Sequence, residues 1–240
     1  MKRRIIIWGV SILAFGVLIG GCVEGFLRAR DDARRSSCQL NIIMLAADQF
    51  AKDHDGLFPP LSRMAGNLIF DVETARSYFF YGYEDYLCES DPNAPPKSEA
   101  RKVRDPAEVT YWSYAYLGYF IEDERQGLAF LDAYRETIEA GGDFTDDLIV
   151  PEGSGNLGGD TLYRLRNPEA LPDELRPLAE RAHEIPVAVE WPGNHRQMGG
   201  HVAFLDGHTE YMLYPGDFPM TPAFIEGLRA LDALKQAAPD

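Results

Sequence analysis

The N-terminal stretch most constrains this chain, because it combines basic residues with a long apolar run. Three basic residues at positions 2–4 precede the run 5–23, in which only Ser11 and Cys22 are polar. As an α-helix this run covers about 28 Å, close to the roughly 30 Å hydrocarbon core of a bilayer. The sequence therefore predicts a transmembrane segment within residues 1–30, followed by a head at 31–240.

The segment after the apolar run predicts a helix over residues 31–55. On a helical wheel, Asn41, Asp48 and Lys52 form one narrow polar stripe, and apolar residues fill most of the remaining circumference. A helix this apolar must be covered on several sides. Either the rest of the chain wraps it, or part of it packs on other copies of the chain.

Charge is divided unevenly along the chain. The first 35 residues carry seven Lys or Arg and three acidic residues, a balance of +4. Because the whole chain carries −15, the remainder carries −19. A head this acidic argues against a nucleic-acid partner, since binding of phosphates needs a basic face.

The head predicts an α+β fold in which residues 61–215 supply the sheet and its loops. Helices are expected at Glu124–Ala140 and, after Thr221, at 221–236. Strands are expected at Ile185–Trp191, His201–Leu205 and His208–Leu213. Asp206-Gly207 joins the last two strands, and such a two-residue hairpin turn requires φ > 0 at both positions.

An acidic, glycine-rich segment at 143–160 predicts a long loop. Its carboxylates could take calcium, but their spacing does not match an EF-hand, so a solvated loop is favoured. The five candidate ligands are Asp143, Asp146, Asp147, Glu152 and Asp160.

The three cysteines allow several interpretations. Cys38 and Cys88 are the only pair in the head, and in an oxidising compartment they would form a disulfide; the alternative is two separate buried thiols. Cys22 follows Ile-Gly-Gly behind the apolar run, which resembles a lipoprotein cleavage box. Lipidation of Cys22 would make the chain an anchored lipoprotein binding module.

Histidines near the hairpin raise the alternative of a metal-dependent hydrolase. His195, His201 and His208 lie close in sequence to Glu190 and Asp206, and these side chains suit zinc or iron. A turn residue such as Asp206 normally bonds local backbone instead. We therefore expect His195 and Asp206 to fix the loop and hairpin, and we predict no catalytic residue, metal or cofactor.

Three segments carry a family resemblance. ARDDARRSSCQLNIIMLAADQFAKDHDGLFPP resembles the post-membrane helix of bacterial prepilin-type, pseudopilin-like proteins, and LCESDPNAP resembles their C-P-S-D-P segment. NHRQMGGHVAFLDGHTEYMLYPGDFPMTPAF resembles their processing-associated signature, a His followed after nine or ten residues by Asp-Gly. The positions that match this signature are His195, Gly199, Gly200, Asp206, Gly207 and His208.

The resemblance implies a pilin-like fold, a long N-terminal helix packed on an antiparallel sheet with short extra helices. It implies a non-catalytic structural or assembly protein of the bacterial envelope, similar to those of type II secretion or type IV pili. The chain would be a single-pass inner-membrane protein with its head in the periplasm. Expected partners are the membrane and other pseudopilin subunits or secretion machinery, with no nucleic acid and no small-molecule substrate.

Overall fold

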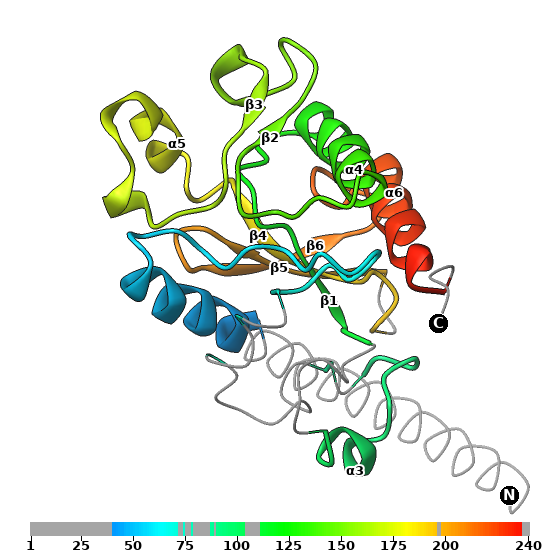
Figure 1. Ribbon diagram of the computed structural model, residues 1–240. Helices are drawn as coiled ribbons and strands as arrows, with labels where there is room; N and C mark the ends of the chain where they lie inside the picture. The colour runs from blue at the N-terminus through cyan, green and yellow to red at the C-terminus, as the bar shows by residue number, and fades with distance from the viewer. Residues whose placement is uncertain are drawn as a thin grey trace, which may run out of the picture.

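A computed structural model describes residues 40–71, 74, 78, 87–88, 90–103, 111–195 and 198–236. These residues build an α+β fold around a four-stranded antiparallel sheet (Figure 1). Its strands, in spatial order, are β1 (Tyr114–Tyr116), β4 (Pro186–Glu190), β5 (Gly199–Phe204) and β6 (Thr209–Leu213). A second, two-stranded sheet pairs β2 (Leu148–Ile149) with β3 (Thr161–Leu162).

Helices surround the main sheet. The described α-helices are the segment 40–53, α3 (Lys97–Ala100), α4 (Glu124–Glu139), α5 (Arg176–Glu180) and α6 (Pro222–Asp232). Short 3₁₀ turns are η3 (Asn156–Gly158), η4 (Pro168–Ala170), η5 (Asp173–Leu175) and η6 (Ala233–Gln236).

The main sheet lies between two helical layers. The 40–53 helix lies on one side of the sheet and the α4–α6 pair on the other (Figure 1). Every residue of β4 and β5 is buried, as expected for strands covered on both faces, whereas the residues of β6 are partly or fully exposed. The two central strands are therefore enclosed on both faces. A side chain at the end of β4, such as that of Glu190, is held by this surrounding structure.

Helix α4 begins and packs as its sequence dictates. The Asp123 carboxylate accepts a hydrogen bond from the Gln126 backbone N–H, which satisfies one unpaired donor of the first turn. On α6, a Cβ built at Gly227 would lie 2.2 Å from Cδ1 of Leu131. Without a side chain at Gly227, the two helices approach closely and complete one face of the core.

The predicted hairpin forms between β5 and β6, but its turn differs from the prediction. Gly207 has φ of +90°, whereas Asp206 is not among the residues with positive φ. The Gly207 N–H donates to the Phe204 carbonyl, and the Phe204 N–H donates to the His208 carbonyl. This pattern is a longer loop that needs positive φ only at its glycine, so the expected two-residue turn is wrong.

The pilin-like fold predicted from the resemblance is wrong for the described residues. The 40–53 helix stops at a tight turn, in which Asp55 and Gly56 take positive φ and the Gly56 N–H bonds to the Ala51 carbonyl. Among the described residues the longest helix is α4, of 16 residues, and it lies on the opposite side of the sheet. The architecture is a sheet between helical layers, not a sheet laid on one long helix.

The membrane predictions are corrected in the same way. Among the residues that the structure describes, no helix combines the length and the apolar character needed to cross a bilayer. The segment 5–23, on which the transmembrane prediction and the inner-membrane location rested, falls outside these residues, as does Cys22. The single-pass assignment therefore has no support from the structure.

Candidate functional site

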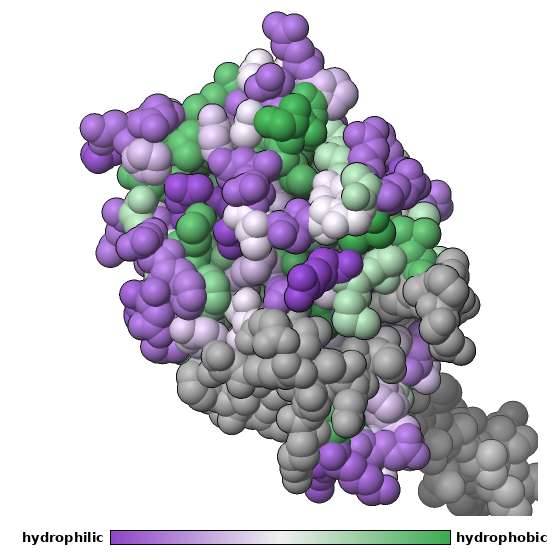
Figure 2. Space-filling model, viewed as in Figure 1, coloured by the Kyte–Doolittle hydropathy of each residue, from purple (hydrophilic) through white to green (hydrophobic). Residues whose placement is uncertain are grey.

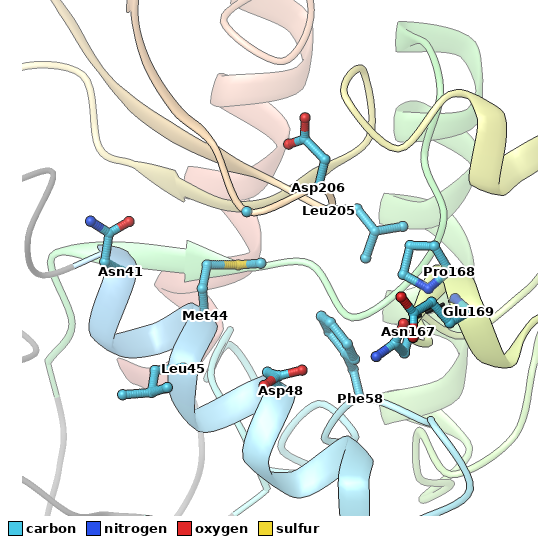
Figure 3. Close-up of a pocket in the computed structure, with 11 residues that line it drawn as sticks. Asn41, Met44, Leu45, Asp48, Phe58, Asn167, Pro168, Glu169, Leu205 and Asp206 are labelled. Carbon is cyan, nitrogen blue, oxygen red and sulfur yellow. Dashed lines mark hydrogen bonds between the residues drawn. The ribbon is translucent and has the colours of Figure 1, made fainter.

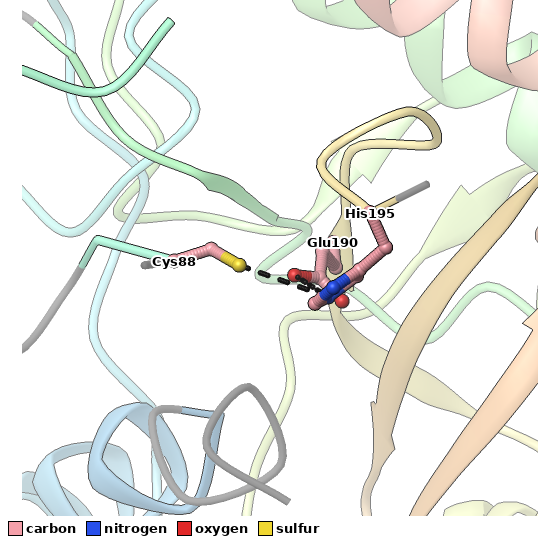
Figure 4. A group of neighbouring side chains, drawn as sticks. All are labelled: Cys88, Glu190 and His195. Carbon is pink, nitrogen blue, oxygen red and sulfur yellow. Dashed lines mark hydrogen bonds and ion pairs between the residues drawn. The ribbon is translucent and has the colours of Figure 1, made fainter. Parts of the chain in front are cut away.

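Three polar side chains meet at the end of β4. Glu190 is the last residue of that strand, His195 lies in the loop that follows it, and Cys88 comes from a distant segment (Figure 4). One ligand atom from each lies within 4.8 Å of the other two. Within the described part of the chain, this is the one group of three or more His, Cys, Asp or Glu side chains gathered so closely.

The Glu190 carboxylate is fully buried and its two oxygens face different histidines. Oε1 lies 3.0 Å from Nε2 of His195. Oε2 accepts a hydrogen bond of 2.9 Å from the His201 backbone N–H and lies 2.9 Å from His201 Nδ1. A buried carboxylate is stable only with such partners, because desolvation of the charge is costly.

Cys88 is positioned by a network of hydrogen bonds in which Ser113 is central. The Cys88 N–H donates to the Ser113 hydroxyl, which in turn donates to Asp91 Oδ2. Tyr111 donates its hydroxyl to the same oxygen of Asp91. Asn194, next to His195, donates its side-chain amide to the Ser113 carbonyl. The segments that carry Cys88 and His195 are thus both fixed to the strand region around Ser113.

The geometry of the cluster does not form a cysteine nucleophile relay. In such a relay the acid orients one ring nitrogen and the nucleophile faces the other. Here Glu190 Oε1 and Cys88 Sγ face the same nitrogen, Nε2 of His195, at 3.0 Å and 3.7 Å. The three atoms converge on one point in space, which suits a shared central atom better than proton transfer along a chain.

The glycines of the signature allow close strand packing. A Cβ at Gly200 would lie 2.6 Å from the Glu190 carbonyl oxygen, and one at Gly199 would lie 2.3 Å from the Met212 carbonyl oxygen. Both distances are too short for a side chain. Gly199 and Gly200 therefore let β5 lie close to β4 and β6, which holds Glu190 in place.

Asp206 and His208 form a separate arrangement at the hairpin turn. The Asp206 carboxylate accepts a hydrogen bond from the His208 N–H, and the His208 ring stacks on Phe204. Burial by itself would raise the pKa of Asp206, but these hydrogen bonds and the nearby histidine charges lower it overall. The alternative prediction, in which all five side chains form one metal site, is therefore wrong in part. Glu190, His195 and His201 lie together, whereas Asp206 and His208 form a separate pair.

The predicted disulfide between Cys38 and Cys88 is not present. Cys88 is buried and keeps its thiol, with Sγ directed at the His195 ring, and Cys38 lies outside the described residues. Sequence reasoning missed the link of Cys88 to Glu190 and His195, because no local pattern connects residues about 100 positions apart.

The acidic loop does not gather its carboxylates in the described structure. Asp143 accepts hydrogen bonds from the backbone N–H and hydroxyl of Thr145, which lower the pKa of that carboxyl. Asp147 accepts the backbone N–H of Arg164. These two carboxylates serve local contacts, and the predicted loop also contains β2 and η3.

A groove of about 470 Å³ opens between the 40–53 helix and the β5–β6 turn. Figure 3 shows Met44, Leu45 and Phe58 along it, with Leu205 above them. Its acidic side chains are Asp48, Glu169 and Asp206. The groove therefore combines an apolar floor with carboxylates.

Comparison with known proteins gives no relative: no protein-family model, curated protein or solved structure matches the chain. The resemblance of the hairpin signature to pseudopilins stays a prediction from the sequence. The chemistry of the described surfaces is therefore the basis for assigning a function.

Proposed function

We propose that the protein is a non-catalytic assembly protein whose copies associate through the groove between the 40–53 helix and the β5–β6 turn. A structural role agrees with the expectation from the signature, whereas a membrane span and a pilin-like fold are not part of the proposal. The observation that carries the proposal is Leu45, which is 51% exposed on a helix whose other apolar residues are mostly buried.

The surroundings of Leu45 support a docking role. Six other large apolar side chains are exposed among the described residues, but none of them lines this groove, and the face in Figure 2 is mostly hydrophilic with small separate apolar areas. Leu45 and the mostly buried Met44 both line the groove from the 40–53 helix, and the β5–β6 turn lies across from that helix (Figure 3). Exposed apolar side chains in a groove are typical of protein contact sites.

The charges favour a second copy of this chain as the occupant. Asp48, Glu169 and Asp206 give the groove a negative rim, although Asp48 also pairs with Lys52 at 2.8 Å. The first 35 residues of the chain are basic and rich in apolar residues, whereas the remainder is acidic. The groove on one copy and the N-terminal part of another are complementary in charge and in apolar character. Repetition of this head-to-tail contact would build an assembly.

Sedimentation velocity on the full-length chain tests the proposal. We expect species larger than a monomer that dissociate as salt is raised, because screening weakens contacts between exposed charges. Leu45→Arg should shift the population to monomer. Ile149→Arg is the matched control, since Ile149 is 71% exposed on β2 and does not line the groove.

Two results would count against self-association at the groove. One is a wild-type chain that remains monomeric at all concentrations and salt levels tested. The other is a pair of variants that shift the population equally, because the contact would then not depend on the groove.

A further inference from the structure

We propose that Cys88, Glu190 and His195 form a binding site for a thiophilic divalent cation, with Zn²⁺ as the best match. The proposal does not depend on self-association through the groove. It rests on the convergence of one sulfur, one oxygen and one nitrogen atom at the end of β4 (Figure 4).

Two ligand-type atoms face the same imidazole nitrogen of His195. Nε2 of an imidazole can offer one proton or one lone pair, so it makes a good hydrogen bond to one neighbour. In the structure it faces both Glu190 Oε1 at 3.0 Å and Cys88 Sγ at 3.7 Å. A cation between the three atoms would accept a lone pair from each of them at once.

The spacing fits a tetrahedral ion. Zinc bonds of about 2.3 Å to sulfur and about 2.0–2.1 Å to nitrogen place these two ligand atoms about 3.6 Å apart at the tetrahedral angle. The observed Sγ to Nε2 distance is 3.7 Å. The Oε1 to Nε2 distance of 3.0 Å would need to open by about 0.3 Å to reach the value for zinc. A small rotation of the His195 or Glu190 side chain is enough.

The donor types select among metals. Thiolate favours zinc over hard cations such as Mg²⁺ and Ca²⁺, which prefer all-oxygen sites. The cluster supplies one thiol, one imidazole and one carboxylate. This combination therefore predicts strong discrimination for Zn²⁺ over Mg²⁺.

The ligands are supported from behind, as metal ligands in proteins usually are. The second oxygen of Glu190 is held by the backbone N–H and ring of His201, and the Cys88 backbone is held by Ser113. Such outer contacts fix the orientation of ligands before the ion arrives. The side chain of His195, at 9% exposed, is more exposed than Cys88 and Glu190.

Cobalt titration of the full-length chain tests the site. After treatment with a chelator, the protein is titrated with Co²⁺, whose bond to a thiolate gives a charge-transfer band in the near ultraviolet. We expect the band to saturate at one equivalent and to vanish when Zn²⁺ displaces the cobalt. Cys88→Ser should abolish the band, and His195→Gln should weaken binding by at least 100-fold.

Matched controls separate this site from other thiols and imidazoles. Cys22→Ser should leave the band unchanged if Cys88 supplies the thiolate, and His208→Gln should leave the affinity unchanged because the His208 ring contacts Asp206 at the hairpin turn. A wild-type protein without the band would overturn the proposal, and so would a band that survives in Cys88→Ser. If the cluster variants do not fold, the melting temperature of the wild type decides: a rise with Zn²⁺ but not with Mg²⁺ supports the site, and no rise refutes it.

Discussion

Replacing Glu190 by glutamine tests how much the buried carboxylate contributes to stability without any metal. Glutamine keeps the shape of the side chain but removes the charge, and the contacts of Glu190 include two with His201 and one with His195. Hydrogen bonds to charged groups contribute about 1.5–3 kcal/mol and neutral ones about 0.5–1.5 kcal/mol. A loss of roughly 1 kcal/mol at each contact predicts a loss of about 3 kcal/mol in the free energy of unfolding.

Urea unfolding in the presence of a chelator measures this loss, with tryptophan fluorescence as the signal because Trp191 adjoins Glu190. In a chain of this size the melting temperature should fall by about 6–12 °C. Glu210→Gln is the matched control, since Glu210 is an exposed carboxylate on β6 and should change stability by less than about 0.5 kcal/mol. If Glu190→Gln costs no more than Glu210→Gln, the carboxylate is not anchored as we argue.

Three further predictions concern the hairpin and its strands. Gly207→Val should destabilise the protein by about 1–3 kcal/mol, because a β-branched residue is strained at positive φ, whereas His208→Ala should cost far less in the same urea titration. Gly200→Ala should lower the free energy of unfolding by about 1–3 kcal/mol, because its Cβ would force β5 away from the Glu190 carbonyl. Gly159→Ala meets no comparable obstruction and should leave the melting temperature nearly unchanged. The pKa of Asp206 is lowered in the folded protein, so its carboxylate stabilises the fold at pH values above the unfolded pKa of 3.8. This stabilisation is lost as the pH falls through the folded pKa. The difference in stability between wild type and Asp206→Asn should therefore shrink below about pH 4, as measured by acid unfolding.

Local signals in the sequence located several elements well. Helix α4 occupies Glu124–Glu139, where its apolar spacing predicted it, because Asp123 starts it and Gly141 takes positive φ just after its end. Its buried face was harder to predict. Helical spacing places Leu128 on the same face as Leu131, yet Leu128 is 39% exposed, whereas Gln126 is buried and bonded to Asn156. A polar residue with satisfied hydrogen bonds can replace an apolar one, and periodicity does not reveal such pairs.

The candidate site shows a different limit of sequence reasoning. Glu190, His195 and His201 are close in sequence, and the structure brings them together. The strands predicted to begin at His201 and His208 do pair with each other, and the register places Tyr211 opposite His201. This register is set by the loop length, which the Asp-Gly pair alone did not fix. Cys88 enters the cluster from elsewhere in the chain, a contact that depends on tertiary packing.

The attachment of Cys88 to the sheet through side chains has a consequence for local motion. Hydrogen bonds of the Ser113 and Tyr111 hydroxyls help to hold Cys88 and Asp91 to the strand region, whereas β4 and β5 share a backbone ladder. Amide hydrogens around 88–91 should therefore exchange with solvent through a partial opening that leaves the β4–β5 ladder intact. The segment around Cys88 would then open separately from the β4–β5 ladder. An ion bound to both Cys88 and Glu190 would couple the two, so that they open together.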